Sequence, residues 1–114
     1  MSANYSASVL TGTQVYTDYA TAVTGQTTLA CNTASNVHQI SLVVNGSPSA
    51  GSLGVEVMPH GTNVWMALSV NGVAVSMSMT SNNSFGPFDG SFKGVRVTPT
   101  GFNGTSFDVI VSGS

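Results

Sequence analysis

Charged residues are scarce in this chain of 114 residues. They make up 5% of the sequence, as two Lys or Arg and four Asp or Glu, whereas ordinary globular chains contain about 25%. Two cations are too few for a nucleic-acid backbone, which is usually neutralised by several Lys or Arg contacts. We therefore expect no nucleic-acid partner. The sequence also shows no basic amphipathic helix of the kind that binds a membrane surface.

Cysteine and long hydrophobic runs are also missing. Cys31 is the only cysteine, so no disulfide can form within the chain and no redox motif is present. No apolar run approaches the roughly 18 residues that a membrane span needs. The first ten residues combine no basic segment with an apolar one, so we expect no signal peptide. These features predict a protein without a membrane partner.

Residues that could carry catalysis or hold a cofactor are equally few. His38 and His60 are the only imidazoles, and neither has a cysteine or carboxylate at metal-ligand spacing. We expect His38 either on the polar side of a strand, beside Gln39, or packed at a strand end, and we expect His60 in a turn. No phosphate-binding loop, dinucleotide-binding glycine motif or nucleophile motif occurs. The sequence predicts a protein that is not an enzyme, with no catalytic residues, no metal and no cofactor.

Hydrophobic residues, at 41%, are abundant enough for a folded core. They alternate with small polar residues, and a period of two is typical of strands that bury one face. The alternating rows are Ile40-Leu42-Val44, Leu53-Val55-Val57, Val64-Met66-Leu68, Val73-Val75-Met77-Met79, Val95-Val97 and Phe107-Val109-Val111. No segment shows the apolar stripe and cap of a helix.

Tight turns separate these rows. Asn-Gly and Asp-Gly pairs favour the positive φ angles of hairpin turns. They occur at Asn45-Gly46, Asn71-Gly72, Asp89-Gly90 and Asn103-Gly104. Short strands at this spacing predict an all-β fold, a single antiparallel β-sandwich or jelly roll. We assign it residues 14–114, and we assign residues 1–13 to an extended N-terminal arm.

The last segment, residues 94–114, is expected to form a hairpin. The rows Val95-Val97 and Val109-Val111 would pair with each other across the turn between them. Arg96 and Asp108 would then stand on the polar face of the hairpin, where they could form an ion pair. An open strand edge promotes association, so we expect another subunit to cover the edge of this hairpin.

Aromatic residues indicate where a subunit contact lies. All three tyrosines, Tyr5, Tyr16 and Tyr19, lie near the N-terminus, and Trp65 points away from the apolar row around it. Aromatic side chains are enriched at protein interfaces. We predict that these four residues contact a neighbouring subunit. Trp65 has two alternative roles, to cover the second face of its own strand or to stack on a sugar ring.

Two stretches of the sequence resemble a family of viral proteins. They are GVEVMPHGTNVWMALSVNG, residues 54–72, and SFGPFDGSFKGVRVTPTGFNGTSFDVIVSG, residues 84–113. In their order of strand, turn and strand they are similar to small β-sandwich virion proteins of tailed bacteriophages. These include capsid decoration (cement) proteins and related head or neck components. The resemblance covers roughly the last two thirds of the chain, from about Val37 onward.

The resemblance implies a structural function without catalysis. Such a protein would bind the major capsid protein or other virion subunits and stabilise the head shell. It would form homo-oligomers, with trimers favoured, and lie on the outer surface of the virion after synthesis in the host cytoplasm. The low charge is consistent with an oligomer, because it is net charge that keeps soluble monomers apart. The alternative is a carbohydrate- or host-surface-binding β-sandwich module, in which Trp65, His60 and Asn63 would line a shallow site.

Overall fold

The computed structural model describes residues 4–5, 15–31, 37–90 and 92–113. In this part of the chain every regular element is a strand and every strand pairing is antiparallel. The strands are β1 (Asn4–Tyr5), β2 (Val15–Val23), β3 (Thr27–Ala30), β4 (Val37–Asn45), β5 (Ser52–Pro59), β6 (Met66–Ala67), β7 (Ser69–Val70), β8 (Val73–Ala74), β9 (Ser76–Ser78), β10 (Asn83–Asp89), β11 (Phe92–Thr100) and β12 (Ser106–Gly113). The prediction of an all-β antiparallel fold is confirmed.

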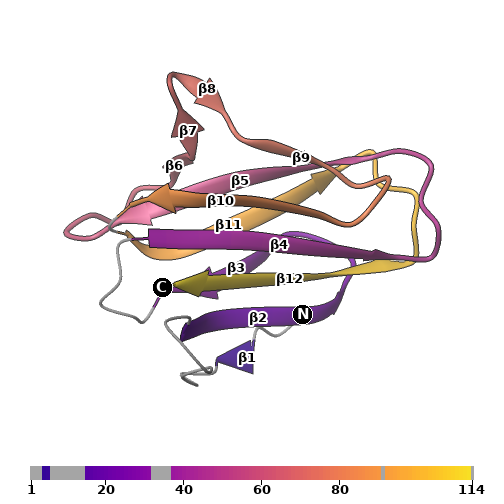
Figure 1. Ribbon diagram of the computed structural model, residues 1–114, viewed down its shortest axis with the longest axis horizontal. Coiled ribbons are helices and arrows are strands. Elements are labelled where there is room, and N and C mark those ends of the chain that lie inside the picture. The colour runs from indigo at the N-terminus through magenta and orange to yellow at the C-terminus, as the bar shows by residue number, and fades with distance from the viewer. Residues whose placement is uncertain (1–3, 6–14, 32–36, 91, 114) are drawn as a thin grey trace.

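Two sheets pack face to face as a β-sandwich (Figure 1). Sheet 1 has the strand order β1-β2-β12-β4-β10. Sheet 2 has the order β3-β11-β5-β6, and β9 also pairs with β5. From β2 to β5, and again from β9 to β12, each strand is followed by one in the other sheet. Strands that follow each other in sequence therefore lie in opposite sheets in these parts of the chain.

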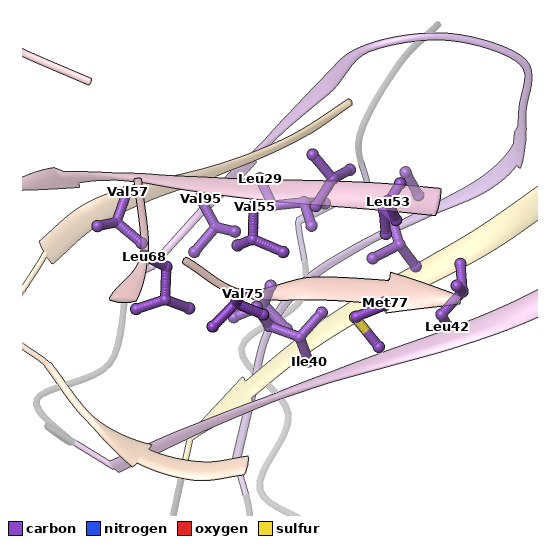
Figure 2. Packing of buried hydrophobic residues seen from close by; sticks show 14 of the residues in the cluster. Leu29, Ile40, Leu42, Leu53, Val55, Val57, Leu68, Val75, Met77 and Val95 are labelled. Atoms are coloured by element: carbon purple, nitrogen blue, oxygen red, sulfur yellow. The ribbon is translucent and has the colours of Figure 1, made fainter. Parts of the chain in front are cut away.

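The alternating rows supply the core between the sheets (Figure 2). On β5, Leu53, Val55 and Val57 are buried, while Glu56 between them lies half-buried on the outer face. Fully burying one such aliphatic side chain stabilises the fold by about 1.5–3 kcal/mol. Other members of this core are Ala20, Val23, Leu29, Ile40, Leu42, Met77, Met79, Val95, Val97, Phe107, Val109 and Val111. The period of two therefore predicted the buried face of most strands correctly.

The predicted C-terminal hairpin is wrong. β11 belongs to sheet 2, where it pairs with β3 and β5, and β12 belongs to sheet 1, where it pairs with β2 and β4. The valine rows of both strands are buried in the common core, but their strands lie in different sheets. Both strands are interior in their sheets, so neither offers an open edge to a partner.

The beginning of the chain is described only at β1. Asn4 and Tyr5 extend along the edge of sheet 1, where they pair with Tyr19 and Asp18 of β2. The rest of the predicted arm, in residues 1–3 and 6–13, lies outside the described residues. The division of the chain into an arm and a sandwich domain stays a prediction.

Candidate functional site

The four residues predicted to contact a subunit fall on different parts of the sandwich. Tyr5 and Tyr16 belong to β1 and β2, and their side chains lie outside what the structure describes. Tyr19 is half-buried on β2, beside Asn4 of β1. The three tyrosines therefore share one edge of sheet 1, whereas Trp65 lies against the outer face of sheet 2. Their contact with a subunit stays a prediction.

Trp65 packs on the outer face of β11. A Cβ added to Gly94 would lie 3.3 Å from the Cη2 atom of Trp65, so the missing side chain at Gly94 leaves room for the ring. The Arg96 guanidinium carbon lies 4.6 Å from the centre of the Trp65 ring. Arg96 also donates from Nε and Nη2 to Oε1 of Glu56, at 3.0 and 2.7 Å. Trp65 therefore covers its own sheet, which was one of the alternatives that the sequence left open.

This geometry corrects the predicted pairing of Arg96 with Asp108. Arg96 pairs with Glu56 because β11 lies beside β5, and the two residues stand opposite each other in that ladder. Asp108 instead accepts a hydrogen bond from the backbone N–H of Ala22, at 2.9 Å. Ala22 has a positive φ of 53° and lies where the register between β2 and β12 shifts. Asp108 therefore stabilises the backbone of β2 at this register shift.

Most of the charge in the chain gathers around Trp65. Lys93 donates to Oδ1 of Asn63 at 2.9 Å. A hollow of about 330 Å³ lies between Trp65, Lys93 and Asp18. Arg96 lies against the Trp65 ring and forms an ion pair with Glu56, so four of the six charged residues lie in this region. A partly exposed ion pair contributes only about 0–1 kcal/mol, so this one adds little to the stability of the fold.

A buried carboxylate and a buried thiol lie beside each other at the junction of the two sheets. Asp18 of β2 accepts hydrogen bonds from the backbone N–H groups of Tyr19, at 2.8 Å, and Ala30, at 2.9 Å. Ala30 belongs to β3, so Asp18 joins sheet 1 to an edge strand of sheet 2. Burial and, second, the charge of Asp18 raise the pKa of the Cys31 thiol to about 12. Cys31 is therefore a protonated, unreactive core residue near neutral pH.

His38 is buried near the beginning of β4, so the alternative that it packs at a strand end is confirmed and the polar side of the strand is wrong. His38 is only 2% exposed. It lies on the same side of β4 as Ile40 and Leu42 and points inward with them. Its ring centre lies 4.9 Å from that of Phe92 and 6.0 Å from that of Phe88. The exposed His60 lies next to Pro59 at the turn that ends β5. Among the described residues, no three His, Cys, Asp or Glu side chains form a group that could hold a metal ion.

An apolar flap, residues 64–74, rises from the edge of sheet 2 and contains β6, β7 and β8. At its base the N–H of Leu68 donates to Val55 O at 3.0 Å, and the N–H of Val75 donates to Leu68 O at 2.8 Å. At its tip, Asn71 and Gly72 have φ angles of 53° and 80°, which confirms the tight turn predicted there. In Figure 1, β7 and β8 project beyond the body of the sandwich.

The flap carries most of the exposed large hydrophobic side chains in the described part of the chain. Their exposed fractions are 58% for Val64, 48% for Met66, 41% for Val70 and 69% for Val73. Outside the flap only Val43, at 37%, is in this class among the described residues. The rows starting at Val64 and Val73 were predicted to be buried, and this is wrong for Val64, Met66 and Val73. Met66 and Val73 lie on strands of two residues and Val64 precedes the first of them.

A second apolar feature adjoins the flap. The β7–β10 hollow has a volume of about 540 Å³ and is lined by residues 68–70 and 84–89. Phe85 and Phe88, whose ring centres are 5.3 Å apart, contribute aromatic walls. Among the described residues of its lining, Asp89 is the one that is charged. Sequence reasoning missed the flap and this hollow, because a period of two does not show whether a second sheet covers the apolar side.

Comparison with known proteins adds no assignment, since no protein family, curated protein or solved structure matches the chain. In the described part of the chain, no helix is long and apolar enough to cross a membrane. The exposed apolar flap, beside its hollow, is therefore the candidate functional site.

Proposed function

We propose that this chain is a non-enzymatic structural protein of a bacteriophage virion, a capsid decoration (cement) protein that binds and stabilises the head shell. The observation that carries the proposal is the exposed flap. Exposed apolar patches on small domains mark binding sites for other proteins. The flap presents four such side chains on a narrow projection, in a chain with 5% charged residues.

The proposed partners are the major capsid protein or other virion subunits, together with further copies of this chain in an oligomer, with a trimer favoured. The protein would act on the outer surface of the capsid after synthesis in the host cytoplasm. Each flap offers only a few apolar contacts. Several flaps on one oligomer would bind the repeating shell together, and this avidity strengthens attachment without new kinds of contact.

The alternative function is a carbohydrate- or host-surface-binding module that uses Trp65. Sugar recognition needs a free aromatic face, but the guanidinium of Arg96 lies 4.6 Å from the centre of the Trp65 ring. Among the described residues, Phe85, Phe88 and Phe92 pack with one another or with His38 and do not form an exposed row. The flap therefore supports assembly better than sugar binding.

Shell binding tests the proposal. The chain would be expressed with the major capsid protein of the same genome, and the shells would be sedimented. We expect the wild-type chain to sediment with the shells. The double substitution Val64→Ser and Val73→Ser should weaken binding about tenfold or more, because the loss of two buried valine contacts costs about 1.4 kcal/mol or more in total.

Val43→Ser is the matched control for this experiment. It makes the same chemical change at an exposed valine on β4, outside the flap, and should bind shells as the wild-type chain does. Equal binding by the flap variant and the wild-type chain would contradict the proposal, as would the absence of wild-type chain from the shell fraction.

A further inference from the structure

The flap and the β7–β10 hollow form a projection and a recess on the same molecule. The tip of the flap carries Val70 and Val73, which stand opposite each other in the ladder of β7 and β8. Val70 contributes to the hollow of its own molecule, whereas Val73 lies outside that lining and is 69% exposed. The most exposed large hydrophobic side chain of the flap therefore does not line the hollow of its own molecule.

The walls of the hollow suit an apolar projection. Leu68, Phe85 and Phe88 contribute to its lining, together with Gly86 and Pro87. Phe88 is buried in the core and Phe85 is half-buried against it, so both rings are packed against the body of the sandwich. Its volume of about 540 Å³ lies in the range typical of binding pockets, about 300–1,000 Å³.

The distribution of charge favours a second copy of this chain as the occupant. Residues 64–74 contain no charged side chain, and Asp89 is the one charged residue among the described residues that line the hollow. Two copies can therefore meet here without placing like charges together. A highly charged partner would find no opposite charges in the flap to pair with.

Resting on the proposed function, we propose that the flap of one copy inserts Val73 into the β7–β10 hollow of a second copy. Projection and recess are different surfaces, so the contact is head-to-tail. Each molecule gives one flap and receives one, and a ring closes when the rotation between copies permits it. A trimer held by three identical contacts is one such ring.

Cysteine cross-linking tests this contact. Val73→Cys places a thiol on the flap, and Ser84→Cys places one in the lining of the hollow. Thr21→Cys is the control, at an exposed residue of β2, which lies three positions from β10 in sheet 1. The native Cys31 is buried, and burial raises its pKa to about 12, so it should not interfere. One chain of each mixture carries a mass tag, so that mixed dimers are resolved on a gel.

Under mild oxidation, the mixture of Val73→Cys and Ser84→Cys should give several-fold more mixed dimer than the mixture of Val73→Cys and Thr21→Cys. Dimers formed mainly by Val73→Cys with itself would overturn the proposal in favour of a contact between two flaps. Equal yields from both mixtures, or no dimer, would also overturn it. If no dimer forms but the wild-type chain binds shells, the proposed function still holds. The flap would then contact the shell and not a second copy of this chain.

Discussion

Replacing Asp18 by alanine is expected to lower the free energy of unfolding by about 2–5 kcal/mol. The carboxylate is 3% exposed and accepts the backbone N–H groups of Tyr19 and Ala30. Alanine would leave both donors without this acceptor and would release the tie between β2 and β3. Urea unfolding followed by the fluorescence of Trp65, the only tryptophan, measures the change.

Two further variants distinguish the loss of the Asp18 hydrogen bonds from the loss of a negative charge in general. Asp89→Ala removes a carboxylate from an exposed residue at the end of β10 and should change stability by no more than about 0.5 kcal/mol. Asp18→Asn keeps one acceptor oxygen, so its loss of unfolding free energy should lie between those of Asp89→Ala and Asp18→Ala. If Asp18→Ala unfolds at the same urea concentration as Asp89→Ala, the carboxylate does not join the sheets.

Raising the pH from about 8 to about 11 should cost the fold about 2–3 kcal/mol through Cys31 alone. Burial and the charge of Asp18 raise the pKa of Cys31 from 9.0 to about 12. The folded chain therefore keeps its thiol proton at pH values where the unfolded chain has lost it. This contribution is fully present below pH 9 and is lost as the pH rises from about 9 to about 12.

Cys31→Ala isolates the contribution of the thiol. All other ionisable groups are the same in the two proteins, so their contributions cancel in the comparison. The stability of the wild-type chain should therefore fall more steeply above pH 9 than that of Cys31→Ala, with the two measured by urea unfolding at each pH. Parallel curves would show that the thiol is not buried as the structure has it.

The buried face of most strands could be predicted from the sequence, but their neighbours could not. Alternation identified Leu53, Val55 and Val57 as core residues because a strand buries one of its two sides. It does not say which strand lies alongside, so β11 and β12 were paired with each other although they lie in different sheets. The same limit explains Arg96, whose partner Glu56 is 40 residues away in the sequence.

Functional features were predicted less completely. Trp65 was singled out correctly as unusual, but its packing on Gly94 depends on a contact between distant segments. Two positions were left open for His38, and its parity with Ile40 and Leu42 favours the buried one that the structure has. The flap could not be predicted, because exposure of Val64 and Val73 depends on where the facing sheet ends.

The central claim is that the flap joins this chain to other subunits, and the mass of the protein in solution tests it most directly. Light scattering over a concentration series should give the wild-type chain a mass that is a multiple of 11.6 kDa, with a trimer favoured. Val43→Ser should behave in the same way. The variant with Val64→Ser and Val73→Ser should remain near 11.6 kDa. A wild-type mass of 11.6 kDa at every concentration, or an oligomer unchanged by the flap substitutions, would contradict the account.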